Sequence, residues 1–172
     1  DCEMAINQAM CGTYKQEITV GIHFWLDHTR TGSSGISADT FKIAMFTSSR
    51  TDANEDLTAY TATNEVSGTA YSAGGAALAS VTLGLSDNSS SVPTAFLDFA
   101  DTTWSTSTIT GARCAVIYNS TLNTAGTGAT VNHAAYPTVC VLDFGGDKSS
   151  SAGDFTIQYP ANDANNAIIR IA

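Results

Sequence analysis

Residues 41–47 read FKIAMFT, and this short stretch decides the fold class. Successive side chains of an extended strand point to opposite faces, so Phe41, Ile43 and Met45 would share one face and the intervening residues the other. A period of two over such a run is typical of a strand with one well-buried face. The stretch therefore predicts a β-strand, and it marks the point where the chain leaves a helical period.

Further short apolar runs follow, separated by segments rich in Gly, Asn, Asp, Ser and Pro, which favour turns. Short strands joined by turns, with no helical pattern between them, are typical of an antiparallel sandwich or barrel. We therefore predict a mainly β fold, an antiparallel β-sandwich or barrel, over residues 31–172. Its other strands are expected at residues 76–83, 94–99, 112–119, 138–144, 154–160 and 167–172.

Two segments share one order of features. Residues 96–109 (FLDFADTTWSTSTI) and 141–157 (VLDFGGDKSSSAGDFTI) each run from an apolar strand through Asp and Phe into a polar loop and a second strand. The order predicts two hairpins of one sandwich, because the Phe after each Asp would alternate back into the core. GGDKSS, residues 145–150, lacks the frame of a phosphate-binding loop and is expected to form the tight turn of the second hairpin.

The first part of the chain has a different period. Apolar residues recur every three or four positions between Ile6 and Leu26, which predicts an apolar stripe along an amphipathic α-helix. Gly12 and Gly21 weaken this helix, and we expect a break near Gly21. Residues 1–30 are thus predicted to form a helical arm before the β-sandwich of residues 31–172, within a single domain overall. The stripe consists of Ile6, Met10, Tyr14, Ile18, Ile22 and Trp25.

Composition limits the partners. The 172 residues include 7 Lys and Arg against 16 Asp and Glu, a formal net charge of −9. Such a charge repels phosphate backbones and anionic lipids, so neither nucleic acid nor a membrane is an expected partner. Only 13% of the residues are charged, and Ser, Thr, Asn, Ala and Gly are abundant. A surface of hydroxyls and amides suits proteins that pack on one another in large assemblies.

The four cysteines indicate neither a metal nor a redox site. They lack the close spacing of a zinc knuckle or a C-x-x-C motif, so no metal or other cofactor is predicted. Cys114 and Cys140 lie inside apolar strand-like runs and are expected to be buried free thiols. Cys2 and Cys11 lie near the start of the chain and could bridge locally or to a neighbouring subunit.

Candidate catalytic patterns are weak. Asp52, Asn54 and Asp56 have the spacing of the first ligands of a calcium loop, but Leu57 and Thr63 stand where Gly and Glu are needed, so a solvated acidic loop is the better interpretation. Asp98 and Asp143 could serve as the acid and base of a glycoside hydrolase. The favoured alternative is that both face outward and bond turn amides or Lys148.

Neither histidines nor aromatic residues assign a function by themselves. No hydrolase or zinc motif accompanies the three histidines at positions 23, 28 and 133. Trp25, Trp104, Tyr71 and Tyr136 could line a sugar-binding surface, although Trp104 is expected to belong to the core. No catalytic residue is therefore assigned, and we predict that the chain is not an enzyme.

Six blocks of the sequence form one pattern when they are taken together. They are FKIAMFTSS, TAYTATNEVSGTAYSAGGAAL, AFLDFADTTW, ARCAVIYN, VLDFGGDKSSSAGDFTIQYP and NAIIRIA. In combination they resemble a family of tailed-bacteriophage virion structural proteins. The resemblance covers about residues 41–172 and departs from the family pattern at Ala70 and Cys114, where Gly is usual, and in a longer loop at 120–137.

The resemblance implies a non-enzymatic component of a phage particle, made in the cytoplasm of the bacterial host. We expect a capsid decoration or cement protein that binds the major capsid protein on the head shell and forms a homo-oligomer, with a trimer preferred. The apolar stripe of the N-terminal arm would then contact a neighbouring subunit. The alternatives are a neck, tail or fibre component, or a carbohydrate-binding module displayed on the particle.

The block EVSGTAYSAGG, residues 65–75, would then serve as architecture. Gly68, Gly74 and Gly75 would allow tight backbone paths, and Tyr71 would supply buried area. Glu65 is expected either to cap a turn or to pair across a subunit contact.

Overall fold

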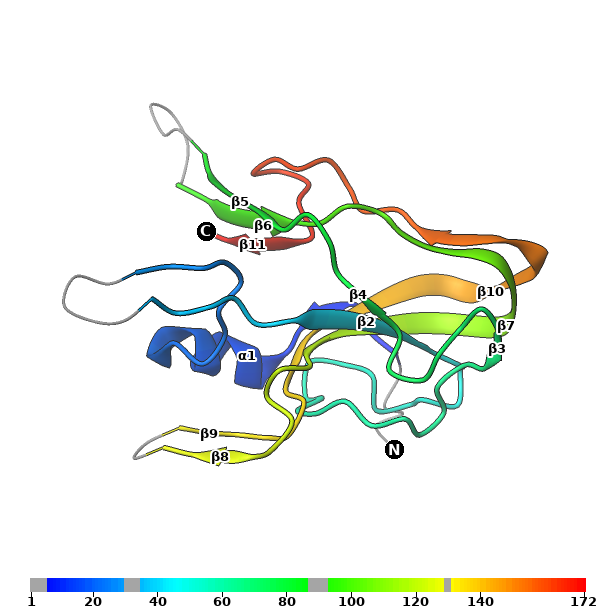
Figure 1. The fold of residues 1–172 in the computed structure, drawn as a ribbon, viewed down its shortest axis with the longest axis horizontal. Coiled ribbons are helices and arrows are strands. Elements are labelled where there is room, and N and C mark those ends of the chain that lie inside the picture. Colours follow the sequence, from blue (N-terminus) through cyan, green and yellow to red (C-terminus); the bar gives the residue numbers. More distant parts are fainter. Residues whose placement is uncertain (1–5, 30–34, 87–92, 129–130) are drawn as a thin grey trace.

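The computed structural model describes residues 6–29, 35–86, 93–128 and 131–172, and Cys2 therefore lies outside the described residues. The fold is mainly β, with antiparallel sheets and a short N-terminal α-helix (Figure 1). The two layers form a β-sandwich that does not close into a barrel. The predicted fold class is thus confirmed, in its sandwich form.

Two long strands build the framework of both layers. β7 (Thr102–Asn119) and β10 (Thr138–Ile157) pair antiparallel from Thr138 opposite Tyr118 to Ile157 opposite Thr102. In Figure 1 this two-stranded ribbon runs along one layer, turns over at the right and returns along the other layer. The same pair of strands therefore contributes to both sides of the core.

The ribbon turns over at bulges. The register of β10 against β7 shifts between Asp143 and Lys148, and Gly145 on β10 and Gly111 on β7 have φ of 70° and 69°. A β-bulge bends the strand that carries the extra residues and often places a glycine in this left-handed region. The predicted hairpin turn at residues 145–150 is therefore wrong, because this segment lies inside β10. The predicted strands 138–144 and 154–160 belong to that one strand.

The larger sheet has the order β1-β10-β7-β2-β4, with β3 also paired to β7. β2 (Phe41–Phe46) lies between β7 and β4, and five of its six side chains are buried. The strand is thus buried on both faces, whereas one buried face was predicted. The remaining members are short: β1 (Ala9–Met10), β3 (Gly68–Thr69) and β4 (Ala76–Ala77).

The smaller sheet has the order β11-β6-β5. It consists of β5 (Thr82–Leu85), β6 (Ala95–Asp98) and β11 (Ile169–Ile171). The predicted strand at residues 76–83 is wrong as a single element, because β4 belongs to the larger sheet and β5 to the smaller one. Ser80 lies between them with φ of 52°. A separate two-stranded sheet pairs β8 (Gly126–Thr127) with β9 (Asn132–His133).

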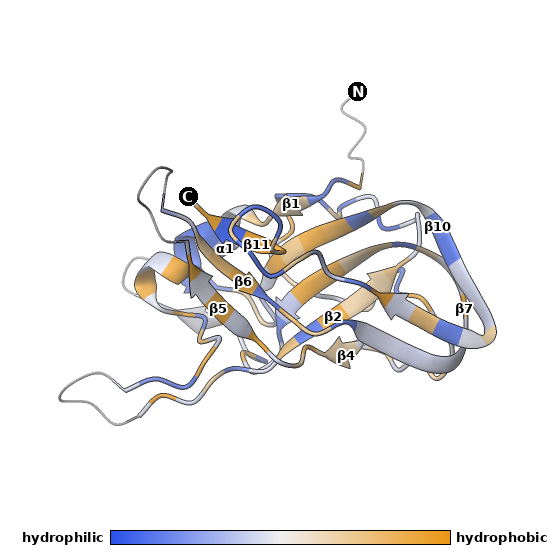
Figure 2. Ribbon diagram, turned by 90° about the horizontal axis from the view of Figure 1, so that it is seen from above, coloured by the Kyte–Doolittle hydropathy of each residue, from blue (hydrophilic) through white to orange (hydrophobic). Residues whose placement is uncertain are grey.

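The core lies between the layers. Figure 2 shows apolar residues concentrated along β2, β6, β7 and β10. Most of the largest fully buried side chains come from three of these strands and include Phe46, Ile43, Met45, Ile109, Ile117 and Val141. Cys114 and Cys140 are buried free thiols, as predicted from their apolar runs, and Cys11 is a buried free thiol as well.

The N-terminal segment is not the predicted amphipathic helix. β1 pairs with β10, the helix α1 covers only Gly12–Glu17, and a 3₁₀ turn η1 (Ile18–Val20) follows and ends at Gly21 with φ of 72°. The helix predicted between Ile6 and Leu26 is therefore wrong. The β-branched run Ile18–Val20 and the two glycines disfavour a long helix. None of the described helices is long and apolar enough to cross a membrane.

The predicted apolar stripe still points inward, but from several local conformations. Tyr14 is 2% exposed, and Ile6, Met10, Ile18 and Trp25 pack against the core of the same chain. Ile22 is half-buried. The segment is thus joined to the sandwich by a strand pairing and by side-chain packing.

Candidate interaction surface

Glu65 is the centre of a hydrogen-bonded cluster in the block of residues 65–75. Its Oε1 accepts hydrogen bonds from the Tyr71 hydroxyl at 2.7 Å and the Gly74 N–H at 2.8 Å, and its Oε2 accepts one from the Tyr60 hydroxyl at 2.7 Å. The Tyr71 hydroxyl in turn accepts the N–H of Met45 on β2 at 2.9 Å. Of the two expected roles, Glu65 therefore fills the first, because it caps a turn within its own chain.

Two glycines of the same block allow the backbone to lie directly on the larger sheet. A Cβ atom at Gly68 would lie 1.8 Å from the Thr108 carbonyl oxygen, and one at Gly75 would lie 1.8 Å from the Ile43 carbonyl oxygen. Both glycines also have positive φ, of 155° and 68°. Any side chain there would clash with the strand below. The tight backbone paths expected at Gly68 and Gly75 are thus confirmed.

Ala70 has φ of 65°, in the left-handed region that favours glycine. A Cβ atom in the left-handed region costs about 1 kcal/mol, so we expect Ala70→Gly to stabilise the fold by roughly that amount. The melting temperature should rise by about 2–4 °C in a differential scanning experiment. Ala79→Gly, at an exposed loop position outside the positive-φ set, is the matched control and should not stabilise. Equal shifts in the two variants would contradict the strain at Ala70.

The candidate carboxylate pair is not brought together. Asp98 is 2% exposed and its Oδ1 accepts the Phe99 N–H at 2.9 Å, so it does not face outward as expected. Burial raises the pKa of Asp98. Asp143 pairs with Arg113 and accepts the Gly145 N–H at 2.9 Å, a backbone amide inside β10 and not in the turn that was expected. Asp143 lines a hollow that does not include Asp98, and the acid–base pair of a glycoside hydrolase is not formed.

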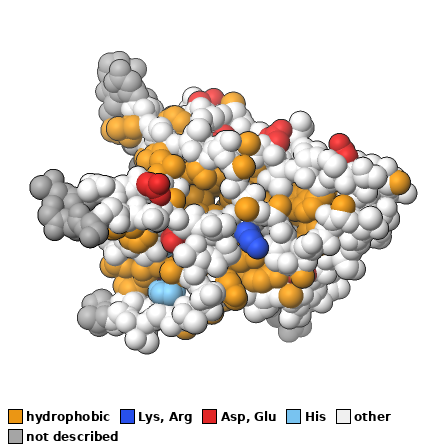
Figure 3. Space-filling model, in the orientation of Figure 1, with side chains coloured by type: hydrophobic (Ala, Val, Ile, Leu, Met, Phe, Trp, Pro, Cys, Tyr) orange, Lys and Arg blue, Asp and Glu red, His pale blue; other side chains and the backbone are white. Residues whose placement is uncertain are grey.

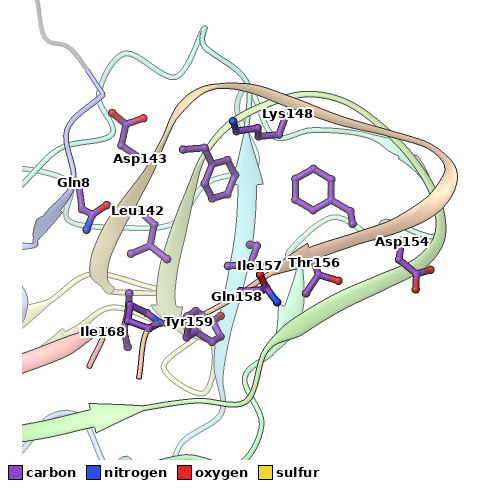
Figure 4. Close-up of a pocket in the computed structure, with 13 residues that line it drawn as sticks. Gln8, Leu142, Asp143, Lys148, Asp154, Thr156, Ile157, Gln158, Tyr159 and Ile168 are labelled. Atoms are coloured by element: carbon purple, nitrogen blue, oxygen red, sulfur yellow. The ribbon is translucent and has the colours of Figure 1, made fainter. Parts of the chain in front are cut away.

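That hollow lies between the two parts of β10 on either side of its bend, and Figure 4 shows it. Its volume is about 480 Å³. Apolar side chains form much of its wall, including Phe144, Phe155 and Tyr159, and Gln8 and Gln158 add amides. Asp154 lies at its other end and accepts the Thr106 N–H at 2.9 Å. Both carboxylates of the hollow are therefore engaged in holding strands.

The remaining candidate residues have structural roles. Trp104 is 6% exposed and belongs to the core, as expected, and the Trp25 ring stacks on Phe41 with centroids 3.4 Å apart. In the acidic loop, Asp52 pairs with Arg50 at 2.7 Å, and Asn54 accepts the Asp56 N–H at 2.8 Å. Among the described residues, no group of three or more His, Cys, Asp or Glu side chains lies close enough to hold a metal ion.

An apolar groove of about 190 Å³ separates the smaller sheet from the N-terminal segment. On the N-terminal side it is lined by Tyr14, Ile18, His23 and Trp25. On the sheet side it is lined by Leu83, Ala95, Phe96, Leu97, Ile169 and Ile171. Three residues of the predicted stripe, Tyr14, Ile18 and Trp25, thus meet in one place, while Ile6 and Met10 pack elsewhere against the core.

The smaller sheet carries apolar side chains beside the groove that the rest of the described chain leaves exposed. Residues paired across the sheet share a face, so Leu83, Leu97 and Ile169 form one row and Leu85, Ala95 and Ile171 form the next. Leu97 and Ile169 are buried, but Leu83, Leu85 and Ile171 are 62%, 69% and 48% exposed. We call these three exposed side chains the apolar rim. Figure 3 shows apolar side chains gathered at this end of the molecule.

A buried polar network supports the wall of the groove. His23 Nε2 lies 2.6 Å from Glu17 Oε2, and the Asn119 amide nitrogen lies 3.1 Å from His23 Nδ1 and 2.7 Å from Asp39 Oδ2. The Asn119 Oδ1 accepts the Thr121 N–H at 3.0 Å, which directs the amide NH₂ toward His23. His23 Nδ1 is therefore the acceptor, and Nε2 carries the proton that is donated to Glu17.

Sequence reasoning missed both the rim and the network. The alternation of Leu83 and Leu85 in TLGL was a signal for an edge strand with an apolar face, but the strand predicted there ended at residue 83 and left Leu85 out. Comparisons of the chain with protein-family models, with curated proteins and with solved structures each found no match.

Proposed function

We propose that this chain is a structural protein of a tailed-bacteriophage particle, a decoration or cement protein that binds the head shell without catalysing a reaction. The observation that carries the proposal is the uncovered apolar rim at one end of the sandwich. The sequence blocks that resemble phage virion proteins also support it. One of them, residues 65–75, makes hydrogen bonds and close backbone contacts that hold it on the larger sheet, which suits a structural role.

The rim is suited to adhesion. Exposed contiguous apolar surface is unfavourable in water and often marks an interaction site. Each Å² of apolar surface that a partner covers contributes about 25 cal/mol, so covering Leu83, Leu85 and Ile171 would supply several kcal/mol before the cost of association. The proposed partners are the major capsid protein and further copies of this chain.

A protein that binds the assembled shell, and not the dissociated subunits, stabilises the shell by its binding free energy at every site. Particles stripped of this chain should therefore lose integrity at a lower temperature than intact particles, and re-addition of the purified chain should restore the original value. Genome release followed by dye fluorescence during heating measures the difference. Unchanged melting of stripped particles would rule out cementing.

Copy number separates the head from the other parts of a particle. Quantitative mass spectrometry should find on the order of hundreds of copies per particle for a shell protein, because a closed symmetric shell repeats each site many times. A dozen or fewer would indicate the neck, tail or fibre alternative.

A carbohydrate-binding module is the second candidate, and one observation favours it. The hollow along β10 combines the aromatic rings of Phe144, Phe155 and Tyr159 with two glutamine amides, a lining able to stack on and hydrogen-bond a sugar. Titration with host polysaccharide tests it. Saturable binding that is lost in Gln158→Ala would support this candidate over a purely structural role.

A further inference from the structure

We propose that the free edge of β5 pairs with β5 of a second copy of this chain, antiparallel across a two-fold axis, with Gly84 opposite Gly84. The proposal gives the rim a specific occupant. It rests on the proposed function only in treating the rim as adhesive.

The backbone groups on the free edge of β5 can be assigned. The Ser86 N–H donates to the Thr94 carbonyl at 3.0 Å, so Ser86 and Thr94 form a hydrogen-bonded pair. Backbone groups of successive residues alternate between the two edges of a strand. Gly84, opposite Phe96, therefore also points its N–H and C=O toward β6, and Leu83 and Leu85 point theirs away from it. Among the described residues, β5 has no strand partner except β6.

Among the described residues, the free edge of β10 is protected, whereas that of β5 is not. β10 beyond its short pairing with β1 carries Asp143, Asp147, Lys148 and Asp154 and shifts register repeatedly. Charges and bulges are the usual means by which natural strands avoid pairing with another chain. β5 has an unbroken register with β6 and contains no charged residue, and its two leucines are among the most exposed apolar side chains. This edge has the features of a strand that is used for pairing.

Charge favours a second copy as the occupant. Copies of a chain with a net charge of −9 repel each other wherever carboxylates face one another. Residues 82–86 and 93–97 carry no charge, Asp98 after them is buried, and Asp87 follows the paired residues in the sequence. A basic partner would be drawn instead to the acidic faces of the molecule. The neutral edge of β5 is the place where two acidic copies can approach.

The two-fold register is self-consistent. With Gly84 opposite Gly84, Leu83 of each copy lies opposite Leu85 of the other, and each such pair exchanges two backbone hydrogen bonds. Directly opposed residues point to the same face, so the four leucines form one apolar surface continuous with both grooves. The opposite face is already filled at its centre, since a Cβ atom at Gly84 would lie 2.2 Å from the Phe96 ring.

Substitution of Leu83 and Leu85 by charged residues tests this register. Both positions are exposed, so lysine or glutamate should leave the chain folded, which thermal unfolding checks. L83K/L85K and L83E/L85E each place like charges opposite each other, and their dissociation constants for self-association should rise at least about tenfold. L83K/L85E places Lys opposite Glu in both pairs and should remain associated. Ser151→Lys, on the exposed edge of β10, is the control for added charge alone.

Sedimentation equilibrium on the purified chain gives the result. The wild type and L83K/L85E should have twice the 17.9 kDa chain mass, and an equal mixture of L83K/L85K with L83E/L85E should recover the dimer. A monomeric or trimeric wild type, or an L83K/L85K variant that dimerises like the wild type, would overturn the proposal. A monomer that still binds the shell through the apolar rim would overturn the β5 pairing but not the proposed function. A dimer that is absent from particles would overturn the proposed function but not the β5 pairing.

Discussion

Replacing Glu17 with alanine is expected to lower the free energy of unfolding by about 3 kcal/mol. Glu17 is 2% exposed, and its carboxylate accepts the Nε2–H of the equally buried His23 side chain at 2.6 Å. Alanine would leave that N–H buried without its partner, and it would also leave a cavity where the carboxylate was. Urea unfolding followed by tryptophan fluorescence measures the change, because Trp25 lies in the adjacent wall of the groove.

Glu17→Gln separates charge from hydrogen bonding. The amide oxygen of glutamine can still accept the His23 proton, so this variant should lose only about 1–2 kcal/mol. Glu55→Ala removes an exposed carboxylate from the loop whose backbone contacts Gly12, and it should change the free energy by less than about 0.5 kcal/mol. Equal losses for Glu17→Gln and Glu17→Ala would show that the charge, and not the hydrogen bond, maintains the network. A Glu17→Ala variant as stable as the Glu55 control would refute the network's contribution altogether.

The network illustrates what periodicity cannot predict. Glu17 and Asn119 are far apart in sequence, and their side chains are linked through His23 only after the N-terminal segment has packed against β7. Nothing in the sequence around His23 distinguishes it from a surface histidine. A side-chain contact of this kind depends on the tertiary fold, which local patterns do not contain.

Local period predicted the β elements well where the strands are short and straight. The run at residues 41–47 forms β2, and the runs at 94–99 and 167–172 form β6 and β11 within a few residues. The error at residues 145–150 has a physical reason. A bulge that bends a strand and a turn that ends one both use glycine with positive φ, so Gly145 gave the same signal for either.

The helix predicted from the apolar stripe of the N-terminal segment was wrong for a related reason. Spacings of three and four residues indicate a helix only when the chain keeps one conformation. Here β1, α1 and η1 follow each other within twelve residues, and each brings one or two of the apolar side chains to the core. The burial of Tyr14 was thus predictable from the pattern, but the path of the backbone was not.

Stability is expected to fall steeply in alkaline solution, and this is the largest effect that the structure implies. Cys11, Cys114 and Cys140 are each 4% exposed or less. Burial raises the pKa of all three thiols above the ordinary value, to about 12 for Cys114. Burial also raises the pKa values of several tyrosines, among them Tyr118 to about 12. These acids keep their protons in the folded chain at a pH where an unfolded chain releases them.

The direction follows from proton binding. A cysteine in the unfolded chain has a pKa of about 8.5, so above that pH the unfolded state binds fewer protons than the folded state. The free energy of unfolding therefore falls as pH rises. The contribution of each thiol is complete below the unfolded pKa and is lost progressively up to the folded pKa. Each thiol costs about 1.4 kcal/mol per pH unit in this window, so at pH 10.5 Cys114 and Cys140 together should remove about 5 kcal/mol, and Cys11 adds to the loss. This total is comparable with the whole stability of an ordinary domain.

Urea titrations from pH 7 to pH 10.5 under a reductant measure the effect, and a variant with alanine at positions 11, 114 and 140 is the matched control. Alanine packs as a small apolar side chain but does not titrate, so this variant should be less stable at pH 7 and should lose much less stability between pH 8.5 and pH 10. Above about pH 10 the tyrosines should add to the loss in both proteins. A wild-type free energy that stays constant to pH 10 would show that the three thiols ionise as readily in the folded chain as in the unfolded one, which is incompatible with their burial inside the sandwich.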